Sequence, residues 1–185
     1  MSNEVNATKA NEAPTRLADG TYQPVLTVSD LDRCGRRWML GASIYNYESQ
    51  CAPAVMFATE PALRKIYAGD EEGYRRSLLS TYRYYNATPQ VSGLLLGAGL
   101  ALEDKGHNDA IDAVQDLKIG LMGSLSGVGD TIFAILIPTI FGSIAAYMGQ
   151  AGNPVGVLLW LAVAIAIFVW KLFDWRIGYK FGDKL

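Results

Sequence analysis

Five consecutive residues, from Asn46 to Gln50, combine amide and carboxylate groups with an aromatic ring. Such a set suits a polyhydroxylated ligand, because hydroxyls need paired donors and acceptors and aromatic rings cover the apolar face of a sugar. Asn46, Tyr47, Glu48 and Gln50 are therefore candidate substrate-binding residues. The same groups can instead serve as polar contacts between helices, and composition alone slightly favours that interpretation.

A second cluster is rich in glycine and runs from Gly120 to Asp130 (GLMGSLSGVGD). A phosphate-binding P-loop ends in Gly-Lys-Ser/Thr, and this segment contains no lysine. No strand is expected before it, which also excludes a dinucleotide fingerprint. The glycines indicate either close helix packing or an unwound stretch inside a membrane. Gly123, Gly127 and Gly129 are therefore candidates for a structural or gating role.

Asp130 is the only charged residue between Ile119 and Trp170. An ionisable residue inside a membrane segment is a functional candidate by default. The alternative is that its carboxylate caps the first turn of the following helix. The two interpretations are about equally supported and are compatible with each other.

The remaining reactive residue types predict no catalytic site and no metal site. His107 stands alone in a polar stretch and is expected to be solvated. Cys34 and Cys51 lack metal ligands at suitable spacing and are expected to be free, buried thiols. The net charge of −2 does not provide the basic surface that a nucleic-acid partner requires. We therefore expect a non-enzymatic protein without cofactor or bound nucleic acid.

Two apolar runs near the C-terminus predict a transmembrane helical hairpin. Residues 131–148 and 155–170 contain no charge, and a Gly-, Asn- and Pro-containing turn at 149–154 separates them. Trp170 and the lysine after it can extend the second run by anchoring at the interface. Basic residues follow the second run but are absent from the turn, so we expect the C-terminus in the cytoplasm. The glycine-rich segment and the hairpin together occupy 119–185.

The rest of the chain predicts a disordered tail and several shorter helices. Residues 1–24 show no apolar periodicity and are expected to form a disordered cytoplasmic tail. Within 25–118, a capping box at Thr27 and Asp30 starts a helix, and residues 71–85 form an amphipathic helix. The predicted fold is all-α: an integral membrane protein with amphipathic or re-entrant helices and a C-terminal transmembrane hairpin.

Three further segments carry specific expectations. The mostly apolar segment 38–63 contains Asn, Glu and Gln, so it should be packed inside protein or line a polar cavity. Pro53 should bend its helix or divide it into two pieces. Residues 91–102 are apolar but too short to span a bilayer, and are expected to be re-entrant or buried. Residues 103–116 should form a polar connector. Small residues at four-residue spacing should allow helices to approach closely, namely Gly93, Gly97 and Ala101.

Four short motifs, in order and near the family spacing, resemble component IID of mannose-family (mannose/fructose/sorbose) sugar phosphotransferase systems over about residues 26–182. The motifs are Ala42-Ser43 with Asn46-Tyr47-Glu48, then Pro61 to Tyr67 (PALRKIY), then Tyr85 to Pro89 with Leu100 to Glu103, and Lys118 to Asp130. The resemblance implies one membrane domain, 25–185, that translocates a hexose together with component IIC. Phosphoryl transfer would take place on separate IIA and IIB partners.

The same resemblance implies a multi-pass subunit of a hetero-oligomer in the cytoplasmic membrane, in contact with lipid. It places Asn46, Tyr47 and Glu48 along the sugar path. The chain departs from the family where Ser49, Gln50 and Cys51 replace Arg, Met and Gln, which displaces the glutamine by one position. The chain is also shorter than family members. These departures support an alternative, a truncated, non-transporting scaffold or regulatory paralogue that docks on a phosphotransferase complex.

Overall fold

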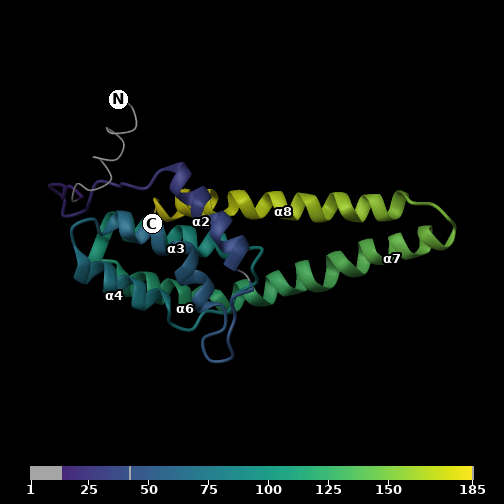
Figure 1. Ribbon diagram of the computed structural model, residues 1–185, viewed down its shortest axis with the longest axis horizontal. Helices are drawn as coiled ribbons and strands as arrows, with labels where there is room; N and C mark the ends of the chain where they lie inside the picture. Colours follow the sequence, from purple (N-terminus) through teal and green to yellow (C-terminus); the bar gives the residue numbers. More distant parts are fainter. Residues whose placement is uncertain (1–13, 42, 185) are drawn as a thin grey trace.

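The computed structural model describes residues 14–41 and 43–184, which contain helices and no extended strand. In chain order these are α2 (Val28–Gly41), α3 (Ala52–Ile66), α4 (Glu71–Thr81), α5 (Ser92–Gly106), the 3-10 turn η1 (His107–Asp109), α6 (Ile111–Gly129), the π-helical η2 (Asp130–Leu136), α7 (Ile137–Gln150) and α8 (Val155–Gly182). Figure 1 shows a bundle of helices at one end and a long two-helix hairpin extending from it. The predicted all-α class is confirmed.

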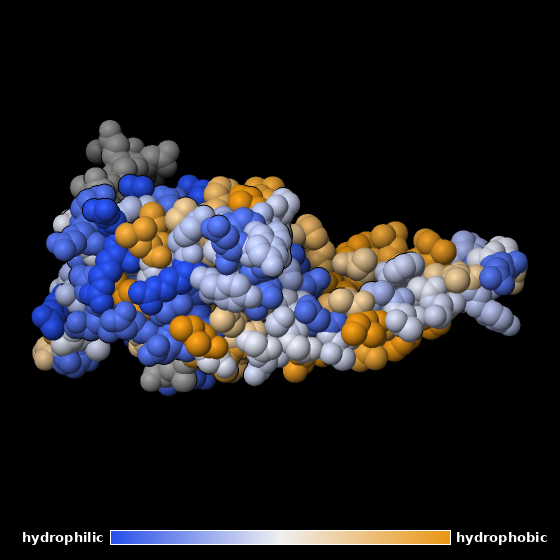
Figure 2. Space-filling model, turned by 90° about the horizontal axis from the view of Figure 1, so that it is seen from below, coloured by the Kyte–Doolittle hydropathy of each residue, from blue (hydrophilic) through white to orange (hydrophobic). Residues whose placement is uncertain are grey.

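The hairpin consists of two helical rods joined by a tight turn at residues 151–154. One rod, Ile111–Gln150, is 40 residues long and comprises α6, η2 and α7, while the other is α8 with 28 residues. Each rod contains a stretch long and apolar enough to cross a membrane, of which only 6% is buried. Figure 2 shows apolar side chains over much of the outside of the hairpin and a mainly polar bundle. The predicted transmembrane hairpin is therefore confirmed.

Helix α5 is buried at the centre of the bundle and packs along the C-terminal part of α8. A Cβ atom on Gly97 would lie 2.9 Å from the backbone nitrogen of Tyr179, and one on Gly182 would lie 2.6 Å from the Cα of Ala98. The two helix backbones are in direct contact, which is the close approach that the small residues of α5 predicted. Of the two alternatives for this apolar segment, the structure has the buried helix, and it continues to Gly106.

Asp174 of α8 fixes the beginning of α5. Its carboxylate is completely buried and accepts a hydrogen bond from the backbone N–H of Gly93 at 3.1 Å. The first turn of a helix leaves its N–H groups free, so an acidic side chain can cap it from a neighbouring helix. Two indole N–H groups hold the chain just before this point: Trp38 donates to the carbonyl of Pro89 and Trp170 to that of Gln90.

The prediction that residues 103–116 form a polar connector is wrong at its start. Glu103 and Asp104 belong to the last turn of α5, and both are buried. Asp104 accepts hydrogen bonds from the backbone N–H groups of Val25 and Leu26, at 2.9 and 3.0 Å. Glu103 accepts one from the Tyr67 hydroxyl at 2.8 Å, and burial raises the pKa of Glu103. These side chains attach the segment before α2 and the end of α3 to α5.

His107 is buried, and the expectation that it is solvated is wrong. It follows α5 with a positive φ of 47°, and only 5% of it is exposed. Its ring stacks on Tyr22 with 3.7 Å between ring centroids, and Tyr67 approaches edge-on. Burial lowers the pKa of His107. Tyr22 belongs to the predicted tail, of which residues 1–13 lie outside the described residues.

Protonation of His107 is expected to destabilise the fold at mildly acidic pH. Since its pKa is lowered in the folded state, the unfolded chain takes up the proton first, and this contribution to stability is lost as pH falls below about 6.5. The carboxylates of Asp70 and Asp104 oppose the shift without cancelling it. Between about pH 7.5 and 5, the melting temperature should fall further for the natural chain than for His107→Gln. If the melting temperatures of the two proteins fall equally with pH, the result would contradict the burial of His107.

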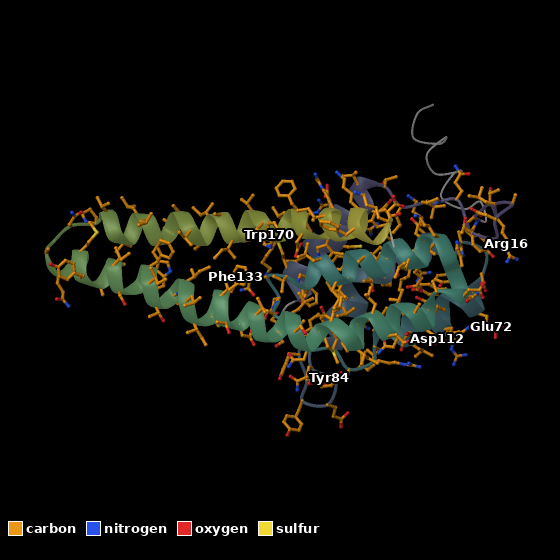
Figure 3. All side chains as sticks on the ribbon, turned by 180° about the vertical axis from the view of Figure 1, so that it is seen from behind. Arg16, Glu72, Tyr84, Asp112, Phe133 and Trp170 are labelled. Carbon is orange, nitrogen blue, oxygen red and sulfur yellow. The ribbon has the colours of Figure 1, made fainter. Side chains whose placement is uncertain are left out.

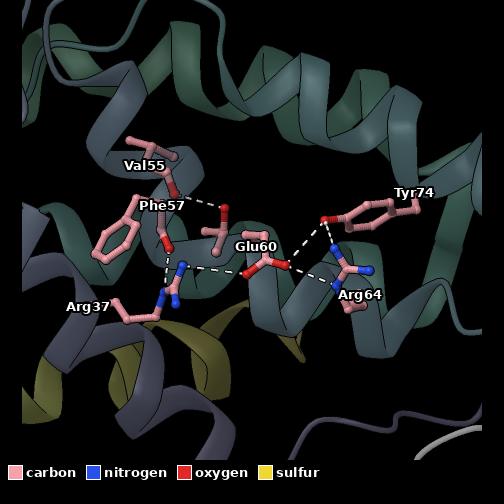
Figure 4. A network of polar contacts seen from close by, with 7 residues as sticks. Arg37, Val55, Phe57, Glu60, Arg64 and Tyr74 are labelled. Carbon is pink, nitrogen blue, oxygen red and sulfur yellow. Dashed lines mark hydrogen bonds and ion pairs between the residues drawn. The ribbon is translucent and has the colours of Figure 1, made fainter.

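Glu60 joins three helices of the bundle (Figure 4). It forms ion pairs with Arg37 of α2 at 3.5 Å and with Arg64 of its own helix α3 at 3.0 Å. The Tyr74 hydroxyl of α4 donates to it at 3.4 Å, and Arg37 also donates to the Phe57 carbonyl at 2.6 Å. Glu60 is thus held by protein contacts, although its side chain is still 29% exposed. The expectation of packing inside protein is wrong for the earlier part of the segment, because residues 43–48 belong to the loop between α2 and α3 and most of them are exposed.

Candidate functional site

The predicted substrate-binding motif lies on the loop between α2 and α3. The chain breaks there as expected, since Pro53 stands in the first turn of α3, where its missing N–H costs nothing. Asn46 shapes the loop: its Oδ1 accepts from the Ser49 N–H at 2.7 Å, and its carbonyl accepts from the Gln50 N–H at 3.0 Å. Gln50 has a positive φ of 57° and donates to the carbonyl of Tyr47 at 3.0 Å.

Two residues of the motif project from this loop. Tyr47 is 92% exposed, and Glu48 is also exposed. Neither side chain has a hydrogen-bond partner within residues 14–41 and 43–184. Their groups are free to meet a ligand or a second protein, whereas Asn46 and Gln50 are occupied in holding the loop in shape.

A second loop, residues 82–91 between α4 and α5, anchors the first. The Cys51 N–H donates to the carbonyl of Tyr85 at 2.9 Å, and the Tyr85 N–H donates to the carbonyl of Ser49 at 3.3 Å. Tyr85 is completely buried, but it lies in this loop and not on a helix, because α4 ends at Thr81. The amphipathic helix is therefore shorter than predicted.

The same second loop also contacts Asp130. The Thr88 hydroxyl donates to the Asp130 carboxylate at 2.7 Å, and the Ser126 hydroxyl lies 3.3 Å from its other oxygen. Asp130 has helical backbone angles, and the rod continues through it from α6 into η2. The cap interpretation is therefore wrong, since a helix that continues offers no free N–H groups there.

The glycines before Asp130 lie in unbroken helix, so the unwound alternative is wrong. Gly129 packs against Thr88, whose Cβ would lie 2.5 Å from a Cβ on that glycine. Gly123 and Gly127 face open space, with no atom within 4 Å of such a Cβ among the described residues. Close packing inside this chain thus accounts for Gly129 alone.

An open hollow of about 350 Å³ lies between the 82–91 loop and α6. Its lining consists of Tyr84, Asn86, Ile119, Met122, Gly123, Ser126 and Gly127. This volume is at the lower end of the range for small-molecule sites. In Figure 3, Tyr84 is at the base of the hairpin, close to α6. Sequence reasoning missed Tyr84, whereas Asn86 and Ser126 belong to recognised motifs but were not singled out as site residues.

The two predicted clusters are thus brought to one place. The first loop is bonded to Tyr85 and the glycine-rich helix to Thr88, so the short 82–91 loop connects them. Two segments that the sequence separates by about eighty residues are thus both hydrogen-bonded to one short loop at the base of the apolar hairpin. The first loop can present a carboxylate and a tyrosine ring to a neutral polar ligand, and the lining of the hollow adds an amide and hydroxyl groups.

Comparison with known proteins gives consistent matches. The family model for the mannose/fructose/sorbose family IID component of the phosphotransferase system (PTS) matches residues 25–185. The PTS mannose-specific EIID component of Escherichia coli (strain K12) is 34% identical over 142 residues, covering 75% of this chain and 50% of that protein. The fructose permease IID component of Bacillus subtilis (strain 168) is 30% identical over 152 residues, covering 80% and 54%.

A solved structure agrees with the sequence matches. The cryo-EM structure of the mannose transporter ManYZ in complex with microcin E492 contains a chain that superposes with a TM-score of 0.77 at 28% identity, covering 88% of this chain and 61% of that one. This chain spans about half the length of the curated relatives it matches. Since the family model matches from residue 25 to the end, the chain belongs to the mannose/fructose/sorbose family of phosphotransferase-system IID components.

Proposed function

We propose that this chain is a membrane subunit of a mannose-type, phosphoenolpyruvate-dependent sugar permease, and that it passes a hexose across the cytoplasmic membrane together with component IIC. The observation that carries the proposal is the meeting of the two family motifs at the 82–91 loop, beside an open hollow of about 350 Å³. The ManYZ transporter chain with the same fold supports it.

In this proposal the partner subunit completes the site. The hollow is open on one side, and small-molecule sites normally enclose most of their ligand. The open glycines Gly123 and Gly127 line it, and small residues let a second helix approach closely within a membrane. Glu48 would accept hydrogen bonds from sugar hydroxyls, and the ring of Tyr47 would cover the apolar face of the sugar.

Phosphoryl transfer would remain with the IIA and IIB partners. A phosphate-accepting histidine needs an accessible ring nitrogen, whereas His107 is 5% exposed and covered by Tyr22. We place the C-terminus in the cytoplasm, since Lys180 and Lys184 follow the second apolar run and the hairpin turn carries no basic residue. The alternative of a non-transporting scaffold keeps the same docking surface and lacks only the transport.

Docking can be tested by co-purification of the tagged chain with component IIC in detergent. We expect stable capture by the natural chain and its loss in Gly127→Leu, because a leucine would keep the partner helix at a distance. Gly149→Leu is the matched control, since Gly149 also faces open space but lies at the far end of the hairpin. Equal capture by both variants would exclude this glycine face as the interface.

A further inference from the structure

Helix α2 lies beside α8 at the point where the charge-free part of α8 ends. Arg176 of α8 donates to the Asp32 carboxylate at 2.6 Å, and a Cβ on Gly35 would lie 3.8 Å from the carbonyl oxygen of Lys171. Asp32 is next to Arg176, and Gly35, further along α2, is next to Lys171, which comes earlier in α8. The two helices are therefore antiparallel here. Lys171 is the first charged residue after the run 155–170. The C-terminal end of α2 therefore points toward the membrane.

One face of α2 is buried and the other is polar with an apolar end. Leu31, Cys34 and Trp38 belong to the core. The residues of the opposite, exposed face are Ser29, Arg33, Arg36 and Leu40. Leu40, at the membrane-directed end, is 73% exposed, and Arg36 stands one turn before it on the same face. A basic residue next to an exposed apolar one is typical of helices at a bilayer interface.

Arg36 and Lys171, like Arg33, form no ion pair among the described residues, whereas two other nearby cations do. Arg37 pairs with Glu60 and Arg176 with Asp32. In contrast, within residues 14–41 and 43–184 no ion pair involves Arg36 or Lys171. Arg36 is exposed and Lys171 half-buried, and the residue before Arg36, Gly35, packs against the backbone of α8 at Lys171.

We propose that Arg36 and Lys171 bind the phosphate headgroup of an anionic phospholipid, with Leu40 against its acyl chains. Two cations that form no ion pair within residues 14–41 and 43–184 supply the charge that a lipid phosphate requires. Their place at the end of the charge-free run of α8 puts this charge at headgroup depth. A soluble anion would gain nothing from Leu40, whereas a lipid would cover it.

The proposal is tested by lipid competition on the purified full-length chain in neutral detergent. Palmitoyl-oleoyl phosphatidylglycerol and phosphatidylcholine are added in equal amounts, and native mass spectrometry measures the ratio of the two bound lipids. The natural chain should prefer phosphatidylglycerol. Arg36→Gln combined with Lys171→Gln should reduce the preference by about fivefold for each charge removed. Arg36→Lys should retain it, because the charge is kept.

The matched control removes two cations elsewhere. Arg75→Gln with Arg76→Gln changes the net charge equally, at exposed positions on α4. This control should keep the natural lipid ratio. A natural ratio in the Arg36/Lys171 variant, or an equal loss in the control, would overturn the proposal. If the double variant melts at a lower temperature, Arg36→Gln alone decides the question, since Arg36 is exposed and contributes no core contact.

Discussion

Glu48→Gln is expected to reduce hexose uptake by about tenfold or more, while the protein still assembles in the membrane. A hydrogen bond to a charged group contributes roughly 1.5–3 kcal/mol, and the glutamine keeps the shape but loses the charge. Because the Glu48 side chain is exposed and has no partner among the described residues, its loss should not weaken the fold. Uptake of radiolabelled hexose is measured in cells that also produce component IIC and the phosphocarrier partners.

Glu72→Gln is the matched control for this experiment. Glu72 is an exposed carboxylate at the end of the bundle away from the hairpin (Figure 3) and should not affect uptake. Asn46→Ala should also reduce uptake, but indirectly. It removes the Oδ1 that accepts the hydrogen bond from the Ser49 N–H, and so changes the shape of the loop. If Glu48→Gln and Asn46→Ala both show the uptake of the natural chain, the Asn46–Gln50 loop does not line the sugar path.

Gly178→Ala is expected to lower the free energy of unfolding by about 3 kcal/mol, because overpacking here cannot be relieved by a side-chain rotation. A Cβ on Gly178 would lie 2.7 Å from the carbonyl oxygen of Gly93 and closer still to that of Leu94. The backbones of α5 and α8 would have to separate. For a chain of this size the melting temperature should fall by about 10 °C, measured in detergent.

Gly123→Ala provides the comparison for Gly178→Ala. It makes the same chemical change in a helix, but no atom lies within 4 Å of the added methyl group among the described residues. Its melting temperature should be unchanged or slightly higher, since alanine favours helix over glycine. A small, equal effect of both substitutions would show that α5 and α8 are not in backbone contact.

The hairpin and the closely packed face of α5 could be predicted from the sequence because their signals are local, whereas the identity of α8 as the helix that packs there could not. A charge-free run, a Gly-Asn-Pro turn and four-residue spacing of small residues each depend on neighbours in the chain. The break between α2 and α3 was likewise visible, since Pro53 carries its own backbone constraint. Such features need no knowledge of what packs against them.

The buried polar residues could not be predicted in this way. Glu103, Asp104 and His107 look solvated in sequence, and their burial depends on partners far along the chain. Tyr67 donates to Glu103, and Tyr22 stacks on His107. Only the fold supplies these hydrogen bonds and contacts, without which burial of a polar group would be costly.

The candidate site was predicted in part. Residue types identified the Asn46–Gln50 loop, but not that Asn46 and Gln50 would turn inward to shape it. Asp130 stood out as a lone charge, yet its hydrogen-bond partner Thr88 is 42 residues away and no periodicity indicates it. The roles of these residues in substrate binding remain predictions.

The central claim, that this chain translocates a hexose with component IIC, is tested most directly by complementation. Cells that lack their own EIID component receive this chain together with component IIC and the IIA and IIB partners, and phosphoenolpyruvate-dependent hexose uptake is measured. We expect uptake well above that of cells without the chain. A chain that co-purifies with component IIC but restores no uptake would contradict transport and favour the scaffold.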